Sequence, residues 1–335
     1  MQKMRPTTLG ALIAFAAAAS FAPGTAKAQE FSFDMPEQTV TAGAVGGSWF
    51  IISTAIMDLV ESQVDGFSYT VVPGGGVSNP ISVQRGDASM GMGYTTNLFA
   101  AYTALEAPYD QPTEDLRGIL NLNVASIMHP WILAERGVTT VSELAERQMP
   151  VRIDTGTRGT GGELAAMRAL EAHGVSYDNI RQWGGSVTHS SYSEAIDRMR
   201  DGHIDAFKND DILRHPLFVD LTTSRNVVLM DMDPDIIEEL AESFGYDPVI
   251  VPAGTYDGQD TDIHSFAQHH VLFGHKDLPD DFVYALVKLV FENKDRLVST
   301  HEVFSDLDPM VGGTGFPMPL HPGAERFYRE IGAID

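Results

Sequence analysis

The stretch IHSFAQHHVLFGH, residues 263–275, decides the fold because it is a long β-rich segment that has a counterpart earlier in the chain. The counterpart is ASIMHPWILAER, residues 125–136, which directly follows another predicted strand, LRGILNLN, at 116–123. The residues between the two long segments have their own alternation of strand and helix patterns. We therefore predict two lobes that are joined by two crossing strands.

The rest of the chain continues the same alternation outside the two long segments. QTVTAG (38–43), FSYTVVP (67–73) and ASMGMGY (88–94) are strand-like, and a helix pattern follows each of them. This alternation is typical of an α/β fold with parallel sheets, and a cleft between two such lobes is a natural small-molecule site. The predicted boundaries are lobe 1 at 29–126 and 270–335, lobe 2 at 127–269, and hinge strands at about 125–136 and 263–275.

The first residues have the pattern of a secretory signal peptide. Lys3 and Arg5 precede the apolar run LGALIAFAAAASF (9–21), and the small residue Ala28 closes the region. The run is shorter than the roughly 20 apolar residues that a membrane-spanning helix needs, which disfavours the alternative of a membrane anchor. We predict that residues 1–28 are cleaved and that the mature protein is exported to the periplasm.

The composition limits the possible partners. The chain has 22 Lys and Arg against 46 Asp and Glu, a net charge of −24, and no cysteine. A surface this acidic repels nucleic acid, and a chain without cysteine has neither disulfides nor thiolate chemistry. We expect no nucleic-acid partner.

The loop sequences do not support nucleotide binding or hydrolysis. TGTRGTGGE (155–163) lies between a strand and a helix, but it lacks the Gly-Lys-Ser/Thr sequence of a phosphate loop. In GGSWF (46–50) a nucleophile elbow would need glycine in place of Phe50. Ser48 is therefore interpreted as a helix N-cap or as a hydrogen-bond donor to a ligand.

Histidines gather in the second long segment, which leaves metal capture as an alternative. His269 and His270 would face opposite sides of a strand, and no H-E-x-x-H motif accompanies them or the nearby His264 and His275. Imidazole nevertheless suits zinc, so the alternative stays open. We expect no catalytic residues, no cofactor and no resident metal.

Four loops rich in glycine or hydroxyl groups each join a strand to a helix: 43–49, 74–78, 94–96 and 155–161. In open α/β sheets such loops gather at the carboxyl ends of the strands, and helix N-termini there favour anions. Arg158 can clamp a carboxylate. The predicted ligand-binding residues in these loops are Gly46, Gly47, Ser48, Trp49, Gly75, Gly76, Tyr94, Thr95, Thr96, Thr155, Gly156, Thr157, Arg158 and Thr160.

Eight stretches resemble, in order, the TAXI family of solute receptors of tripartite ATP-independent periplasmic (TRAP) transporters. They are TAGAVGGSWF, VVPGGGVSNP, GDASMGMGYTTN, IDTGTRGTGGE, SYSEAIDRMRDGHIDAF, VPAGTYDGQDTDIHSF, LPDDFVYALVKLVFENKD and PMPLHPGAERFYREIG. The resemblance covers about residues 38–332. It implies a type II periplasmic-binding-protein fold and delivery of a ligand to a permease with small and large membrane subunits, driven by an ion gradient. Family ligands include amino acids such as glutamate, dicarboxylates and 2-oxo acids.

The sequence also departs from the family pattern. Trp49 stands where tyrosine is common, and Tyr94-Thr95-Thr96 replaces a usual Gln-Ser-Asp. After the predicted strand HIDAF (203–207), KNDD (208–211) replaces an apolar, small-residue stretch and can line the lobe 2 side of the cleft. Lys208 joins the predicted ligand-binding residues, where it pairs with an anion or is neutralised by Asp210 or Asp211.

These observations predict a periplasmic receptor that binds a small organic anion and performs no chemistry on it. Three alternatives stay open. One is a receptor of an ABC importer for a heterocycle, such as a thiamine precursor, or another small solute. The others are an exported hydrolase that uses Ser48 and a metal-capture protein that uses His269 or His270.

Overall fold

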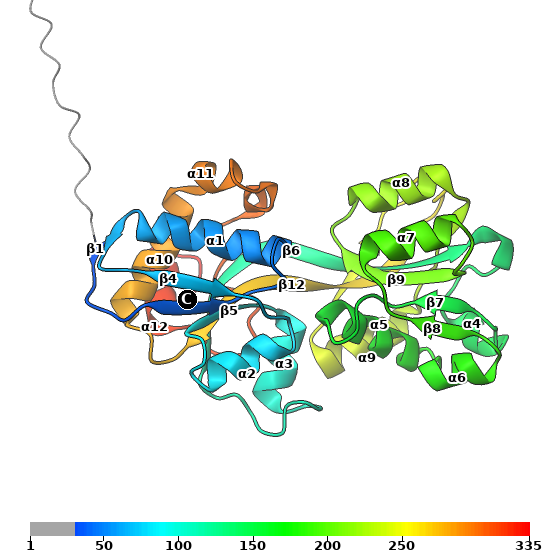
Figure 1. Cartoon of the computed structure of the whole chain (residues 1–335), viewed down its shortest axis with the longest axis horizontal. Helices are drawn as coiled ribbons and strands as arrows, with labels where there is room; N and C mark the ends of the chain where they lie inside the picture. The colour runs from blue at the N-terminus through cyan, green and yellow to red at the C-terminus, as the bar shows by residue number, and fades with distance from the viewer. Residues whose placement is uncertain (1–30) are drawn as a thin grey trace, which may run out of the picture.

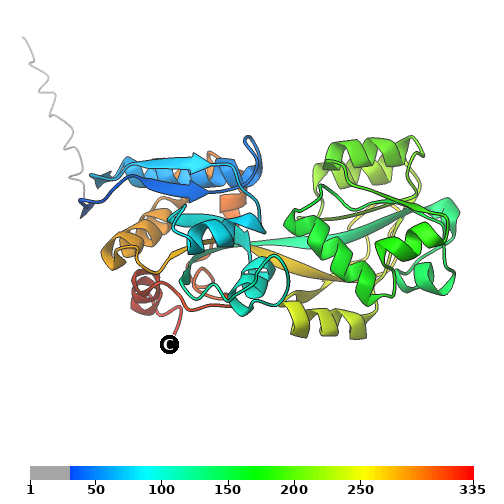
Figure 2. The same ribbon diagram turned by 60° about the horizontal axis from the view of Figure 1, so that its bottom comes forward.

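The computed structural model describes residues 31–335 and has two lobes joined by two long strands (Figure 1). The predicted signal peptide at 1–28 lies outside the described residues. The long strands are β6 (Leu116–Leu133) and β12 (Ile263–His275), and they connect the lobes in both views (Figures 1 and 2).

Lobe 1 combines the beginning and the end of the described chain. Its C-terminal helix α12, red in Figure 2, lies in the same lobe as the blue N-terminal strands. The elements of this lobe are β1 (Phe31–Ser32), β2 (Gln38–Thr41), α1 (Ser48–Glu61), β3 (Val64–Asp65), β4 (Tyr69–Val72), α2 (Ser78–Gln84), β5 (Met90–Tyr94), α3 (Thr95–Thr103), α10 (Asp280–Glu292), α11 (Lys294–Val298), the 3₁₀ helix η2 (Glu302–Asp306) and α12 (Pro322–Glu330).

Lobe 2 is built from the segment between the two long strands. Its elements are the 3₁₀ helix η1 (Ala134–Arg136), α4 (Ser142–Glu146), β7 (Arg152–Asp154), α5 (Gly161–Ala172), α6 (Tyr177–Gln182), β8 (Ser186–Thr188), α7 (Tyr192–Arg200), β9 (Ala206–Asp211), α8 (Pro216–Ser224), β10 (Val227–Leu229), α9 (Pro234–Phe244) and β11 (Asp247–Val251).

One sheet runs through both lobes in the order β4-β2-β5-β12-β6-β9-β7-β8, with β10 beside β6 and β11 beside β12. The strands β4, β2 and β5 are parallel in lobe 1, and β9, β7 and β8 are parallel in lobe 2. β12 pairs antiparallel with both β5 and β6. This is the α/β architecture that the alternating pattern predicts.

Each lobe has its own buried apolar core. In lobe 1 the core residues come from positions up to Val124 and from Val271 onward. In lobe 2 they come from positions between Ile127 and Ala267. Because few core residues are shared across the two strands, the lobes can change their relative position by bending β6 and β12.

The first long segment differs from its predicted boundaries at two places. The predicted strands 116–123 and 125–136 form the single strand β6, in which Asn123 has a φ of 58° and the chain continues through this irregular position. β6 ends at Leu133, and a 3₁₀ turn replaces the last three predicted strand residues. Across residues 31–335, none of the helices combines the length and the apolar composition that crossing a bilayer requires.

Candidate ligand-binding site

A cavity of about 370 Å³ opens between the two lobes. It lies where β5, β6, β9 and β12 come together, because the strand register places His270 opposite Tyr94 and Ile127 opposite Asp211. The lining residues are Gly43, Ala44, Gly47, Ser48, Trp49, Gly74, Gly75, Gly76 and Tyr94 from lobe 1, Ser126 and His270 from the long strands, and Thr157, Thr160, Gly161, Gly162, Tyr192, Asp210 and Asp211 from lobe 2.

The structure brings together residues from all four predicted loops. Those that line the cavity are Gly47, Ser48, Trp49, Gly75, Gly76, Tyr94, Thr157 and Thr160. Other predicted residues lie next to these in the chain or behind them and do not line the cavity: Gly46, Thr95, Thr96, Thr155, Gly156, Arg158 and Lys208.

Helices from both lobes begin at the cavity wall, among them α1 of lobe 1 and α5 of lobe 2. The N-cap of α1 is Gly47, which has no side-chain cap, so the first N–H groups of the helix have no side-chain acceptor. The N-cap of α5 is Thr160, whose hydroxyl accepts from the Glu163 N–H at 3.2 Å, which is the first of the two bonds of a capping box. Free N–H groups at helix starts carry partial positive charge and favour an acceptor such as a carboxylate.

Glycine at position 161 lets the two walls approach each other. A methyl group there would lie 2.7 Å from Asn97 Oδ1 and 2.7 Å from Tyr94 Cδ2, both of lobe 1. A second contact between the lobes is the ion pair of Arg168 on α5 with Glu106. The lobes are therefore close together in this structure.

A chain of hydrogen bonds orients the aromatic wall of lobe 1. Trp49 Nε1 donates to His270 Nδ1 at 2.9 Å, and His270 Nε2 lies 2.8 Å from Ser126 Oγ. Since indole N–H can only donate, Nδ1 must be the acceptor nitrogen, and Nε2 carries the proton that is donated to Ser126. Ser126 in turn hydrogen-bonds the Tyr94 phenol.

The Ser126–His270 pair resembles a nucleophile and its base, but it has the wrong tautomer for that role. A catalytic base needs an unprotonated nitrogen facing the hydroxyl, and here Trp49 leaves the proton on the nitrogen that faces Ser126. Burial also lowers the pKa of His270 to about 3, so the imidazole is a weak base. The pair fixes the position of Tyr94 and does not activate Ser126.

Lys208 does not contact the cavity, contrary to its predicted role. Its side chain is fully buried, and Ala206, which shares its side of β9, belongs to the apolar core of lobe 2. Within residues 31–335 its Nζ has no hydrogen-bond partner, so neither Asp210 nor Asp211 neutralises it by a direct bond. Burial lowers the pKa of Lys208 to about 7.

Arg158 lies outside the cavity on the exposed side of its loop. Its Nη2 is 2.9 Å from His189 Nε2, and His189 Nδ1 is 3.1 Å from the buried Thr155 hydroxyl. The predicted carboxylate clamp is thus turned toward a neighbouring loop, because His189 offers an acceptor there. His189 does not line the cavity either.

Asp210 and Asp211 are on the lobe 2 wall because β9 continues through them, whereas the predicted strand ends at Phe207. The strand was predicted to end at Phe207 because charged residues, which follow it, are uncommon in a buried strand. Of the four residues of KNDD, the two aspartates line the cavity on the lobe 2 side, whereas Lys208 and Asn209 do not. Four further residues line the cavity but were not among the predicted ligand-binding residues: Ser126, Gly161, Gly162 and Tyr192.

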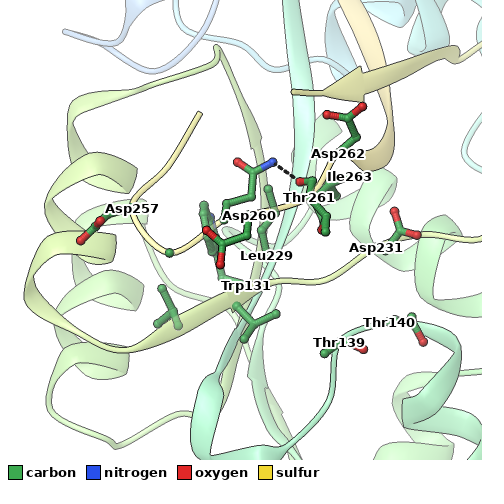
Figure 3. A pocket seen from close by; sticks show the side chains of 14 residues that line it. Trp131, Thr139, Thr140, Leu229, Asp231, Asp257, Asp260, Thr261, Asp262 and Ile263 are labelled. Atoms are coloured by element: carbon green, nitrogen blue, oxygen red, sulfur yellow. Dashed lines mark hydrogen bonds between the residues drawn. The ribbon is translucent and has the colours of Figure 1, made fainter. Parts of the chain in front are cut away.

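A second cavity, of about 270 Å³, lies at the edge of lobe 2 and is also acidic. Figure 3 shows Asp231, Asp257, Asp260 and Asp262 on different sides of it, with carboxylates that do not converge on one point. Two of these groups already accept backbone hydrogen bonds: Asp262 from Ala253 N, and Asp231 from His264 N. The cavity between the lobes is the better candidate site because both lobes contribute to it.

The histidines of β12 do not form a metal centre. In the described part of the chain, no group of three or more His, Cys, Asp or Glu side chains is arranged to hold a metal ion. His269 Nε2 is 2.8 Å from Asp247 Oδ2, while His270 faces Trp49 and Ser126. The predicted opposite orientation of the two histidines accounts for this separation.

Solved structures of solute-binding proteins share the two-lobed fold. PhnD1 from Prochlorococcus marinus in complex with methylphosphonate is 12% identical with a TM-score of 0.51, covering 89% of this chain and 98% of that chain. MatC from Rhodopseudomonas palustris with bound malate is 13% identical with a TM-score of 0.50, covering 90% and 98%. A TctC solute-binding protein from Polaromonas is 16% identical with a TM-score of 0.46, covering 89% and 98%.

At these identities the similarity shows the fold alone, which is the two-lobed fold of periplasmic solute-binding proteins. The sequence model of the NMT1-like family matches residues 40–332, which are nearly all of the described residues. The chain belongs to the NMT1-like family.

Proposed function

We propose that the protein is the solute receptor of a TRAP transporter, of the TAXI type, and works in the periplasm. It captures a small organic solute that carries a carboxylate and delivers it to a permease with small and large membrane subunits. The coupling energy is an ion gradient, and the receptor itself performs no chemistry. The acidic surface, with a net charge of −24, also supports a role without nucleic acid.

The observation that carries this proposal is the cavity that both lobes line at the two crossing strands. A cavity of about 370 Å³ is in the range of small-molecule sites, which begins at roughly 300 Å³. We propose that lobe 1 (29–126 and 270–335) and lobe 2 (127–269) close on the solute by hinge bending. A solute that contacts both lobes favours the closed state, and the permease recognises that state.

The start of α1 at the cavity supports a carboxylate ligand, because its N–H groups need acceptors. The relatives in fold agree with this chemistry: MatC was solved with malate and PhnD1 with methylphosphonate, both small acids. The predicted signal peptide supports export. The transporter type rests on the ordered stretches that resemble the TAXI family.

A binding role is also favoured over hydrolysis. The one Ser–His pair of the cavity, Ser126 and His270, has the proton on the nitrogen that faces the hydroxyl. We expect no turnover of esterase, phosphatase or peptidase substrates. Turnover that is lost in Ser48→Ala or Ser126→Ala would overturn the proposal.

A thermal-shift screen tests the receptor function. The protein is refolded after removal of bound solutes and is then mixed with carboxylates, amino acids and neutral sugars. A solute at 100 times its dissociation constant adds about 2.7 kcal/mol of stability, so a true ligand gives a clear rise in Tm. The best ligand should also be transported in vesicles that contain the permease subunits only when the receptor is present. If sugars give the largest shifts and acids give none, the proposed ligand class is wrong.

A further inference from the structure

The charges at the cavity do not match a simple anion site. Among the described residues that line it, Asp210 and Asp211 are the only ones with formally charged side chains, and none is Lys or Arg. His270 is neutral at physiological pH because burial lowers its pKa to about 3. A dicarboxylate would place its second negative charge beside carboxylates with no cation to compensate it.

Hydrogen bonds hold one side of the Asp210 carboxylate and leave the other side free. Thr96 Oγ1 donates to Gln268 Oε1, so the Gln268 amide nitrogen faces Asp210 and donates to its Oδ2 at 2.6 Å. Asp210 is only 2% exposed, and over residues 31–335 its Oδ1 has no hydrogen-bond partner. Thr96 thereby acts as a positioning residue, although it does not line the cavity.

A second acceptor next to the cavity also lacks a donor. Asn97 is 1% exposed, and its Oδ1 has no partner in the described part of the chain. This oxygen lies close to Gly76 and Gly161, since a methyl group at these positions would be 2.8 Å and 2.7 Å away from it. Buried acceptors without donors are costly, so a ligand that donates hydrogen bonds would satisfy them.

Asp211 differs from Asp210 because it already has partners. Its Oδ1 accepts from the Ile212 N–H at 2.8 Å, and its Oδ2 is 3.7 Å from His215 Nε2. The rings of Tyr94 and Tyr192 line the cavity, and burial, followed by the nearby charge of Asp210, raises the pKa of both phenols. A carboxylate flanked by aromatic rings is a suitable environment for an ammonium group.

The opposite wall requires an acceptor. Ser48 and Trp49 are the first residues of α1, their backbone N–H groups have no partner within the helix, and both residues line the cavity. The cavity thus presents acceptors from Asp210 on lobe 2 and donors from α1 on lobe 1. A solute that spans it must carry a donor group at one end and an acceptor group at the other.

We propose that Asp210 forms an ammonium subsite and that the solute is a zwitterion, whose amine donates to Asp210 Oδ1 and whose carboxylate accepts from the N–H groups at the start of α1. This inference rests on the proposed receptor function and narrows its ligand class from organic anions to amino acids and similar amino-carboxylates. Dicarboxylates and 2-oxo acids bind more weakly because they lack the amine.

Pairs of probes that differ only in the amine test this assignment. Each L-amino acid is compared with the 2-hydroxy acid that has the same side chain, for instance L-aspartate with L-malate, first by thermal shift and then by calorimetry. We expect the amino acid of the best pair to bind about 10- to 100-fold more tightly, which is the range of a charge-assisted hydrogen bond.

Replacement of the carboxylate gives the matching protein test. Asp210→Asn keeps the size of the side chain and should weaken the best amino acid by about 10- to 100-fold, while its 2-hydroxy acid changes by less than about three-fold. Asp211→Asn removes the same charge from the same wall and should cost the amino acid less, because Asp211 has other partners. Circular dichroism verifies that both variants are folded.

The outcomes separate this inference from the receptor function. Hydroxy acids or dicarboxylates that bind as tightly as amino acids would overturn the ammonium subsite and leave the receptor function standing. The same holds if Asp210→Asn leaves amino acid binding within two-fold, or if amines without a carboxylate bind best. If no solute of either series raises Tm, both the receptor function and the zwitterion assignment fail.

Discussion

Lys208 in the interior of lobe 2 and Asp210 at the cavity lie two residues apart on β9, and both are charged residues in a buried strand. Lys208 is 0% exposed and Asp210 is 2% exposed, and across residues 31–335 each has one polar atom without a hydrogen-bond partner. Burial disfavours the charge of both, since it lowers the pKa of Lys208 to about 7 and raises that of Asp210 to about 6.

The difference between the two positions is what surrounds the free atom. Asp210 lines a cavity, receives one oriented hydrogen bond from Gln268 and keeps one oxygen for a ligand. Lys208 lies outside the cavity, on the side of β9 that carries the apolar residue Ala206. An unpaired buried charge thus indicates a binding role only where a cavity adjoins it, and at Lys208 it is a cost to stability.

The largest expected effect is stabilisation by Lys208→Met. Met is apolar and similar in length, so the variant removes a buried amine that must ionise at low pH. With the pKa at about 7 in the folded state against 10.5 in the unfolded state, we expect a gain of about 5 kcal/mol at pH 6 and about 2 kcal/mol at pH 9. Urea unfolding at the two pH values measures this.

The pH dependence of the stability gain follows from the direction in which the pKa of Lys208 is shifted. A lysine with a lowered pKa supports the folded state above the unfolded pKa, and this support is lost as pH falls through about 7. The same variant should leave solute affinity unchanged because Lys208 does not line the cavity. A loss of binding in Lys208→Met, with the fold intact, would contradict the distinction drawn between the two positions.

Asp210→Asn should also stabilise the protein without ligand, with the opposite pH dependence. The raised pKa means that the stabilising contribution of Asp210 is complete below about 3.8 and is lost as pH rises through about 6. The variant should therefore gain about 3 kcal/mol over wild type at pH 8 and less than about 1 kcal/mol at pH 4. Thermal unfolding over this pH range is the measurement.

Stability and solute affinity measured on the same two variants distinguish Lys208 from Asp210. Lys208→Met should gain stability and keep its affinity for the solute. Asp210→Asn should gain stability and lose affinity for the solute, as is common where function requires an unfavourable group. Equal stability of Asp210→Asn and wild type at pH 8 would mean that Asp210 is already satisfied, and the subsite would lose its main support.

The fold was predictable from the sequence because its strongest signals are long and repeated. The segment predicted at 263–275 is β12 with the same bounds, and the alternation of strands and helices gave the α/β class. The boundary between 116–123 and 125–136 was wrong, because β6 is one strand that pairs with β12 on both sides of Asn123, up to Asn121 and from Ala125 onward. A sequence pattern over a few residues does not show which distant strand a segment pairs with.

The residues of the candidate site were predictable only where a loop motif marks them. Glycine and hydroxyl residues at helix starts identified one half of the cavity, since their chemistry is visible in short stretches. Asp210, Ser126 and His270 come from three strands, and only the register of the sheet brings them to one place. Sequence alternation places Lys208 and Asp210 on the same side of β9, and both are buried, so only the cavity beside Asp210 distinguishes the two positions.

Gly161→Ala should weaken solute binding by about 10- to 100-fold with little change in stability. The added methyl group would lie 2.7 Å from both Asn97 Oδ1 and Tyr94 Cδ2. These atoms belong to the other lobe, so the lobes can relieve the overlap by opening, at the expense of the closed, ligand-bound state. Calorimetry with the best solute measures the loss, and small-angle scattering should show a more open average shape.

Gly137→Ala is a suitable comparison, because a methyl group at that glycine has no atom within 4 Å and the site lies in lobe 2 away from the cavity. Its φ of 62° makes alanine strained, so it should lower stability and leave affinity unchanged. If Gly161→Ala behaves like Gly137→Ala, contact between the cavity walls does not limit binding.

The smallest expected effect is that of Trp49→Phe on the lobe 1 wall. The variant removes the N–H that donates to His270 Nδ1 at 2.9 Å, and with it the constraint on which imidazole nitrogen is protonated. His270 can then donate from Nδ1 and accept from Ser126, so Tyr94 loses its fixed donor. We expect a cost of about 1 kcal/mol in stability and a three- to ten-fold weaker affinity, roughly that of one neutral hydrogen bond. Because the lobe 1 wall is neutral, the loss of affinity in Trp49→Phe should be the same at pH 6 and pH 8, in contrast to that in Asp210→Asn. A loss of affinity that depends on pH would show that His270 titrates. The two walls would then not differ in their electrostatics.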